Sequence, residues 1–406
     1  MEILNNCINN VPLKIINTNK FKTVNIEMFF TRELDYKDIA PYNLLVSILT
    51  SRNATYPSIN SFAAYKEDNY GLSVNGSYTS RGNIGILNFR VSAINSKFSL
   101  NEDLLHIQIN TIKECLYNPL LDEKTLNEVK DVYVSKLKDK LNKKTYILKK
   151  KVNELLGNDS PYGVDIESNI DDISNVTLKD LQRVYDKLLS SKCYVYVIGE
   201  VDSNKVNDEF SFLKVNENSD KLDYSYLKEI KVLNNEYDSK FLQSAISLIY
   251  ECNIVYGDEL FYALKIFIEM LNYDLFNIIR EKYNYCYYIY ALCNNYLNTI
   301  EIVSEIESKN FKDIMRIIDE IIKEYENDKT SDFLITKNKI INLIKANQDN
   351  SRDIALVHFG FDFMGKVNSM EELMSKYENV KYEDVVKVSK MLTLKVASIL
   401  KEANHE

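Results

Sequence analysis

The segment VTLKDLQRV at residues 176–184 returns in a related form, VKYEDVVKV, at residues 380–388. Each copy is followed by an apolar run that predicts a β-strand, residues 193–199 after the first copy and residues 395–400 after the second. Similar segments about half a chain length apart indicate two copies of one structural unit. We therefore predict two domains with the same fold.

A second pair of related segments lies earlier in each half. Residues 62–70 read FAAYKEDNY and precede a predicted strand at residues 71–79, while residues 276–284 read FNIIREKYN and precede a predicted strand at residues 285–293. The spacing between these copies differs from that of the first pair by about the length of a loop. Both pairs indicate that one order of elements occurs twice.

Hydrophobic periodicity predicts strands and helices in the same order in each half. In the first half, strands are expected at residues 22–31 and 83–93, and a long helix with one apolar face is expected at residues 123–156. Paired strands followed by blocks of helices are typical of layered domains. The predicted fold class is α+β, with two homologous domains that each consist of a mainly antiparallel sheet with helices packed on one face.

The boundary between these domains is expected in the polar stretch from Val215 to Lys240, which has no clear period. We predict an N-terminal domain over residues 1–215, a linker over residues 216–240 and a C-terminal domain over residues 241–406.

Composition and charge exclude several classes of function. The chain has 406 residues, of which 45% are hydrophobic and 27% charged, and its formal net charge is -9. Such a chain buries a substantial core, and its acidity argues against nucleic acid as a partner. The N-terminal sequence MEILNNCINNVPLKII lacks the pattern of a signal peptide, and no apolar run is long enough to cross a membrane. We expect no membrane partner and a cytoplasmic location.

Cysteines and histidines do not indicate a metal site or a disulfide framework. The six cysteines form no CxxC pair, so we expect them to be reduced packing residues. The three histidines, His106, His358 and His405, have no second ligand at helical spacing, so we expect ordinary structural or surface roles and no metal in this chain. The GxSxG and GxxxxGK[ST] motifs are also missing, which argues against a serine hydrolase and a phosphate-binding loop.

Several segments resemble the pitrilysin/insulinase family of peptidases, which includes the mitochondrial processing peptidase. APYNLLVSILTSRNATYP at residues 40–57 resembles the metal-site helix of that family. NPLLDE at 118–123 resembles the start of its long helix, SPYG at 160–163 its Pro-Tyr-Gly loop, and YVYVIG at 194–199 the strand that ends its first domain. The resemblance spans essentially the whole chain.

The zinc motif of this family, HxxEH, places two histidine ligands and a general-base glutamate on one helix. The corresponding positions here are Asn43, Val46 and Ser47, and the third ligand, an acid, should fall near Ser135 or Lys136. Valine cannot accept a proton, and asparagine and serine are weak zinc ligands compared with imidazole. The resemblance therefore implies a degenerate zinc site and no peptidase activity of the chain on its own.

One functional motif of the family is present. LFNIIREKYNYCY at residues 275–287 resembles the family pattern LFxxxRExxxxxY, whose arginine and tyrosine reach the zinc site from the second domain. The resemblance implies that Arg280 binds and orients substrate, and that the Tyr287 hydroxyl donates to the oxyanion formed on the scissile carbonyl. The competing interpretation is an exposed helical arginine followed by a tyrosine-rich strand without catalytic function.

These features together predict a role in a complex. Bacterial relatives include pairs in which one chain keeps HxxEH and the other keeps only the arginine and the tyrosine. The resemblance implies a non-catalytic subunit of a heterodimeric zinc metallopeptidase, with zinc in the homologous partner subunit and a peptide or precursor peptide as substrate. The alternative is a catalytically dead peptide-binding or scaffold protein of the same fold. The sequence leaves a homodimer open.

Overall fold

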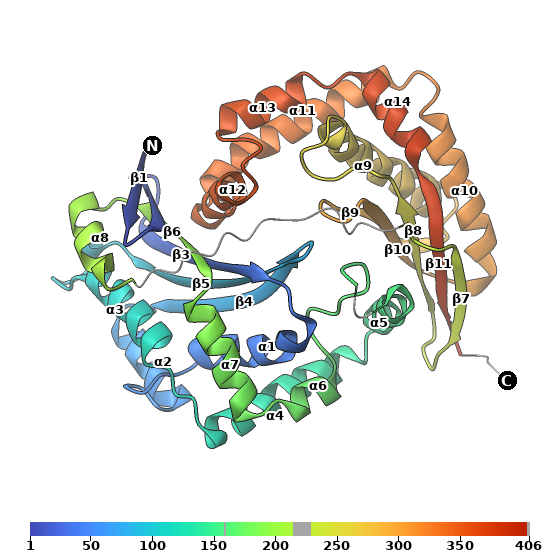
Figure 1. Cartoon of the computed structure of the whole chain (residues 1–406). Helices are drawn as coiled ribbons and strands as arrows, with labels where there is room; N and C mark the ends of the chain where they lie inside the picture. The colour runs from blue at the N-terminus through green and yellow to red at the C-terminus, as the bar shows by residue number, and fades with distance from the viewer. Residues whose placement is uncertain (158–159, 214–228, 404–406) are drawn as a thin grey trace. The chain divides into compact units, whose positions relative to one another are not determined.

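The computed structural model describes residues 1–157, 160–213 and 229–403. The chain divides into two compact units, each built around one sheet (Figure 1). Unit 1 comprises the described parts of residues 1–138, 166–222 and 347–365, and unit 2 comprises those of residues 139–165, 223–346 and 366–406.

Unit 1 contains a six-stranded sheet with the order β1-β2-β6-β3-β5-β4. Only the β2–β6 pair is parallel, so the sheet is mainly antiparallel. The long central strand β3 has the sequence TVNIEMFFTRE, whose β-branched and aromatic residues favour an extended backbone. The strands are β1 (Glu2–Ile8), β2 (Val11–Asn17), β3 (Thr23–Glu33), β4 (Ser73–Arg81), β5 (Ile84–Ile94) and β6 (Lys192–Gly199).

Most helices of unit 1 cover one face of this sheet, as Figure 1 shows for α1, α3 and α7. Helix α7 begins with a capping box in which Thr177 and Asp180 bond reciprocally to each other's main-chain N–H. The helices are α1 (Ile39–Leu49), α2 (Ile59–Asp68), α3 (Leu104–Tyr117), α4 (Glu123–Lys140), α6 (Ile170–Asn175), α7 (Leu178–Leu189) and α8 (Ser203–Glu209), with short 3-10 turns at Tyr36–Asp38, Ser96–Phe98 and Phe210–Phe212.

The opposite face of the sheet is covered by α12 (Ser351–Met364), which comes from the second half of the sequence. Phe359 of α12 packs in one core cluster with Phe29 of β3 and with Tyr194 and Tyr196 of β6. Successive side chains of a strand point to opposite faces, so Met28, which is also fully buried, belongs to the other face. Unit 1 therefore has helices on both faces of its sheet.

Unit 2 contains a five-stranded sheet with the order β7-β11-β8-β10-β9, in which only the β7–β11 pair is parallel. One face is packed against α5, which comes from the first half of the sequence, through Leu148 and Val152. The strands are β7 (Leu233–Asp238), β8 (Ser244–Glu251), β9 (Cys286–Asn294), β10 (Thr299–Ile306) and β11 (Thr393–Lys401). The helices are α5 (Lys144–Leu156), α9 (Phe261–Leu275), η4 (Phe276–Lys282), α10 (Phe311–Glu324), α11 (Thr330–Ala346), α13 (Met370–Glu378) and α14 (Tyr382–Met391).

The predicted α+β fold with two similar, mainly antiparallel domains is confirmed. The single long helix predicted over residues 123–156 is wrong, because α4 ends at Lys140 and α5 begins at Lys144. Apolar residues continue at helical spacing through both helices, but α5 packs on the sheet of unit 2 while most of α4 belongs to unit 1. The N-terminal hairpin β1–β2 was not anticipated.

The two units do not follow the predicted domain boundaries, because each half of the chain contributes one helix to the unit formed mainly by the other half. Part of the predicted linker, residues 216–228, lies outside the described residues. Its later part contains β7, which pairs with β11. In β7 half-buried and exposed residues alternate, with Leu233 and Tyr237 against the core, and the intervening polar residues conceal this pattern in the sequence. Within the described residues, no helix combines the length and apolarity needed to span a membrane.

Candidate functional site

Helix α1 contains the three positions at which the family resemblance expects the zinc motif. Asn43 is buried, and its Nδ2 donates to the main-chain oxygen of Ile166 at 2.9 Å. The Ser47 hydroxyl donates to the main-chain oxygen of Asn43 at 2.9 Å, one helical turn earlier. Both polar side chains therefore bind carbonyl oxygens of the chain itself.

Val46, the third of these positions, packs against strand β4. A Cβ atom placed on Gly76 of β4 would lie 3.0 Å from Val46 Cγ1 and 3.0 Å from Thr50 Cγ2. Glycine is therefore what allows this strand to approach α1 so closely. The space beside Val46 is therefore occupied by the backbone of β4 at Gly76 and by the methyl group of Thr50.

The region expected to supply the acidic ligand lies on α4. Ser135 and Lys136 are both exposed there. Tyr133, on the same helix, donates its hydroxyl hydrogen to the main-chain oxygen of Glu167 at 3.2 Å. Glu167 directly follows Ile166, the acceptor for Asn43, so one loop is bonded to both α1 and α4.

These residues do not fit a zinc ion. The Asn43 amide and the Ser47 hydroxyl donate to main-chain oxygens and Val46 is aliphatic, while neither Ser135 nor Lys136 is a carboxylate. Across residues 1–157, 160–213 and 229–403, no three His, Cys, Asp or Glu side chains are grouped so that they could hold a metal ion. We assign no chemical step to a metal bound at α1.

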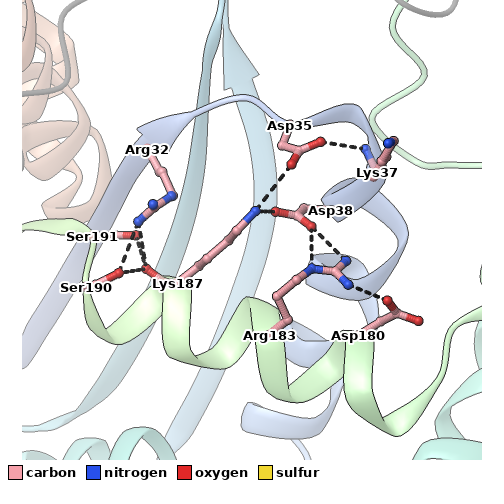
Figure 2. Close-up of polar contacts among 9 residues, drawn as sticks. All are labelled: Arg32, Asp35, Lys37, Asp38, Asp180, Arg183, Lys187, Ser190 and Ser191. Atoms are coloured by element: carbon pink, nitrogen blue, oxygen red, sulfur yellow. Dashed lines mark hydrogen bonds and ion pairs between the residues drawn. The ribbon is translucent and has the colours of Figure 1, made fainter.

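The beginning of α1 is held by a network of ion pairs (Figure 2). The buried Asp38 carboxylate lies 2.9 Å from Arg183 Nη2 and also accepts a hydrogen bond from Lys187, both on α7. Lys187 Nζ lies 3.3 Å from Asp35 as well. Burial alone would raise the pKa of Asp35, but hydrogen bonds from the Lys37 N–H and from Lys187 lower it below its ordinary value.

Replacing Asp38 by asparagine is expected to lower the free energy of unfolding by about 2 kcal/mol, because the buried negative charge that faces two cations is lost and one acceptor oxygen becomes an NH2 donor. Urea denaturation followed by circular dichroism measures this change. Glu200→Gln is a suitable control, since Glu200 pairs with Lys97 at the surface and exposed pairs contribute about 0–1 kcal/mol. Equal costs for the two variants would show that the network at α1 adds no special stability.

Arg280 lies in a stretch of irregular helix that follows α9. Residues Phe276–Lys282 form a π-helical segment, in which the Tyr283 N–H donates to the Ile278 carbonyl five residues earlier at 3.0 Å. π-Helical segments are rare and occur frequently at functional sites. Arg280 therefore lies on a π-helical turn and not on a regular α-helix.

Tyr287 lies in a β-bulge at the start of β9. Tyr287 and Tyr288 together oppose the single residue Glu305 of β10, because the register shifts at this point. The buried Ser304 hydroxyl donates to the Tyr288 carbonyl at 2.7 Å and holds the bulge. Bulges redirect side chains, and Tyr287 is 79% exposed.

The structure brings Arg280 and Tyr287 together. The guanidinium carbon of Arg280 lies 5.3 Å from the ring centre of Tyr287 and 4.7 Å from that of Phe276. Arg280 Nε is 3.5 Å from Glu281, and the arginine side chain is 36% exposed. Contacts of a cation with two ring faces orient the guanidinium while leaving donors available to a ligand. Their role in substrate binding stays a prediction.

Large apolar side chains are exposed on the same elements of unit 2. They are Tyr273, Phe276, Tyr283, Tyr287, Tyr290 and Leu292. Burial raises the pKa of the neighbouring Tyr288, and the Glu305 carboxylate raises it further, so this phenol stays protonated. The elements that carry Arg280 and Tyr287 therefore also carry exposed apolar side chains.

Sequence reasoning did not find Asn272 or Ser304, two residues that bond to the main chain of β9. The available signal for Asn272 was a polar amide within the largely apolar helix FYALKIFIEMLNYDL. Ser304 had no distinguishing signal, because its partner is set by the register of β9 against β10.

Two of the three histidines lie within the described residues. His106 Nδ1 is 2.9 Å from Glu209 at the surface, and His358 on α12 is buried against Phe361, with ring centres 5.6 Å apart. Burial lowers the pKa of His358 to about 4, and the nearby charge of Lys14 lowers it while Asp362 opposes the shift. His405 lies outside the described residues.

We expect stability to fall as the pH decreases from the ordinary histidine pKa of 6.5 towards about 4, because the unfolded chain binds a proton that the buried His358 does not. The difference in unfolding free energy between the wild type and His358→Gln should change by roughly 2–3 kcal/mol across this range. Urea denaturation at several pH values measures it. His106→Gln is the matched control. If that variant reduced the pH dependence of the unfolding free energy as much as His358→Gln does, the assignment to His358 would be refuted.

The sequence of this chain is similar to that of known proteins. Residues 175–341 match the family described as "Peptidase M16 inactive domain". Over 411 residues the chain is 25% identical to the "Probable inactive metalloprotease YmfF" of Bacillus subtilis (strain 168), with 95% of each chain covered.

Solved structures show the same fold over the full length. A conserved protein from Enterococcus faecalis V583 has a TM-score of 0.90 at 20% identity, with 100% of both chains covered. The peptidase M16 inactive domain from Pseudomonas fluorescens has a TM-score of 0.81 at 11% identity, again with 100% of both chains covered.

Proposed function

Because the chain is a non-catalytic homologue of the M16 peptidases, the pitrilysin/insulinase family, we propose that it is one subunit of a two-chain zinc peptidase. Its partner in this proposal is a homologous chain that keeps HxxEH and carries the zinc ion. This chain supplies Arg280 and Tyr287, and the substrate is a peptide or precursor peptide.

The arrangement of Arg280 and Tyr287 carries the proposal. Both side chains are accessible, they contact each other, and each is presented by a departure from regular backbone. π-Helical segments and β-bulges are over-represented at functional sites, which favours a role of this pair beyond packing. At α1, by contrast, the zinc-motif positions are buried and bonded to the chain itself. The accessible Arg280–Tyr287 pair in unit 2, together with the lack of metal ligands at α1 in unit 1, supports a subunit that binds substrate without holding the metal.

The chemistry of the pair suits binding to a peptide carbonyl. The Arg280 guanidinium has donors beyond the Nε that faces Glu281, and these are suited to a carbonyl oxygen of an extended peptide. The Tyr287 hydroxyl is a neutral donor that can stabilise the negative charge developing on the carbonyl oxygen during attack by water. The partner would supply the attacking water and its activation at zinc.

Strand β4 offers a place for the main chain of the peptide. It is the last strand of the unit 1 sheet, so alternate N–H and C=O groups along it point away from β5. An extended peptide can add to such an edge as a further strand, with affinity from main-chain hydrogen bonds. The proposal therefore assigns main-chain binding of a peptide to β4 as a property of unit 1 by itself.

The test is to purify the chain alone and together with a homologue of similar length that carries HxxEH and is encoded nearby. Zinc content is measured by atomic emission and cleavage with a library of fluorogenic peptides. We expect no bound zinc and no cleavage for the lone chain, and cleavage by the pair that exceeds that of the homologue alone. Cleavage by the lone chain would refute the proposal, and a stable pair without added cleavage would favour the scaffold alternative.

A further inference from the structure

Asn272 bonds to the main chain of β9 in an unusual way. Its Oδ1 accepts a hydrogen bond from the Ala291 N–H at 2.6 Å, and its Nδ2 donates to the Ala291 carbonyl at 3.1 Å. Asn272 is near the end of α9, and Ala291 is a buried residue in the middle of β9. One side-chain amide thus satisfies both main-chain groups of a single strand residue.

These main-chain groups lie on the free side of the sheet. Strand β9 is the last strand of the unit 2 sheet, and in an antiparallel pair both polar groups of a residue point either to the partner strand or away from it. A side-chain amide has the same donor and acceptor as a peptide group, so Asn272 takes the position that a further strand would occupy. Just beyond β9, the Tyr256 N–H donates to the Asn295 carbonyl at 2.8 Å and covers the same edge.

The same contact closes the segment that carries the candidate site. Asn272 and Ala291 are 19 residues apart, and both Arg280 and Tyr287 lie between them. Within this segment the π-helical turn presents the arginine and the bulge presents the tyrosine. The two hydrogen bonds between Asn272 and Ala291 fix the end of α9 to β9. They therefore limit how far Arg280 and Tyr287 can separate.

We infer that Asn272 seals the edge of β9 against strand addition and is a positioning residue for Arg280 and Tyr287. Unit 2 then meets a peptide through side chains, namely Arg280, Tyr287 and the exposed apolar residues of α9, η4 and β9, and not through main-chain pairing at β9. The statement about peptides rests on the proposed function. The seal and the positioning are properties of the chain alone.

Amide hydrogen exchange tests the seal. In Asn272→Ala the Ala291 amide is expected to exchange about tenfold faster, which corresponds to the loss of one ordinary hydrogen bond. Asn272→Asp keeps an acceptor for this N–H, so its exchange should stay close to that of the wild type. Asn342→Ala, an exposed asparagine on helix α11 of the same unit, is the matched control and should have no effect. Equal exchange of the Ala291 amide in the wild type and Asn272→Ala would overturn the seal.

A fluorine label tests the positioning. With 3-fluorotyrosine incorporated at residue 287, the ¹⁹F resonance reports on the nearby guanidinium, and Arg280→Ala defines the resonance without it. Asn272→Ala is expected to move the resonance towards that of Arg280→Ala, whereas Asn342→Ala should not. Should Asn272→Ala fail to fold, Asn272→Asp, which loses the donor to the Ala291 carbonyl, is expected to move it in the same direction. An unmoved resonance in a folded Asn272 variant would overturn the positioning role.

These measurements need neither a partner nor a substrate. A two-chain preparation that fails to cleave peptides would therefore count against the proposed function and leave the role of Asn272 standing. Conversely, a pair that cleaves peptides while the exchange rate of the Ala291 amide is unaffected by Asn272→Ala would support the proposed function and refute the seal.

Discussion

Replacing Arg280 by alanine is expected to lower kcat of the proposed two-chain peptidase by about tenfold or more, and Tyr287→Phe by a similar factor. In the proposed roles, the arginine variant would lose the guanidinium that holds the substrate carbonyl, and the phenylalanine variant would lose only the hydroxyl that donates to the oxyanion. A group that acts mainly in the transition state lowers kcat and kcat/KM together. Initial rates with a fluorogenic peptide over a range of concentrations separate the two constants.

A matched control is available within the same unit. Arg316 is an exposed arginine on α10, with 57% of its side chain accessible. Arg316→Ala should leave kcat unchanged. If the variants at 280 and 287 also cleave at the wild-type rate, these two residues only pack, and the chain is better described as a scaffold.

Replacing Phe359 by alanine is expected to lower the free energy of unfolding by about 3–5 kcal/mol, as is usual for removing a buried phenyl ring. Phe359 is 1% exposed and stacks on Phe29 of β3, with ring centres 4.1 Å apart and planes at 4°. Tyr194 meets it edge-on at 5.5 Å, and the Arg81 guanidinium lies 4.8 Å from its ring centre. The ring therefore holds α12, a helix from the second half of the sequence, against the sheet of unit 1.

Urea denaturation measures this cost, and Phe98→Ala provides the control. Phe98 belongs to unit 1 but is 48% exposed, so its removal should cost less than about 1 kcal/mol. A small cost for Phe359→Ala as well would mean that the packing of α12 on the sheet contributes little to the stability of unit 1.

The repeated segments around residues 176–184 and 380–388 were sufficient to predict two similar α+β units, because apolar spacing reports directly on local helices and strands. The same spacing could not show that the helix predicted over residues 123–156 breaks after Lys140. An apolar face must be buried, but periodicity does not say against which sheet. The assignment of α5 to unit 2 and of α12 to unit 1 therefore emerged only from packing.

For the candidate site too, some features could be predicted from the sequence and others depended on the tertiary structure. The family resemblance together with residue type predicted that Asn43, Val46 and Ser47 do not form an HxxEH zinc site, since ligand chemistry depends on side-chain type. The same resemblance singled out Arg280 and Tyr287. The contact between these two, the bulge held by Ser304 and the edge bonded by Asn272 depend on the register of β9 and on the approach of α9. Those are long-range pairings that no local pattern encodes, so only the tertiary structure decided them.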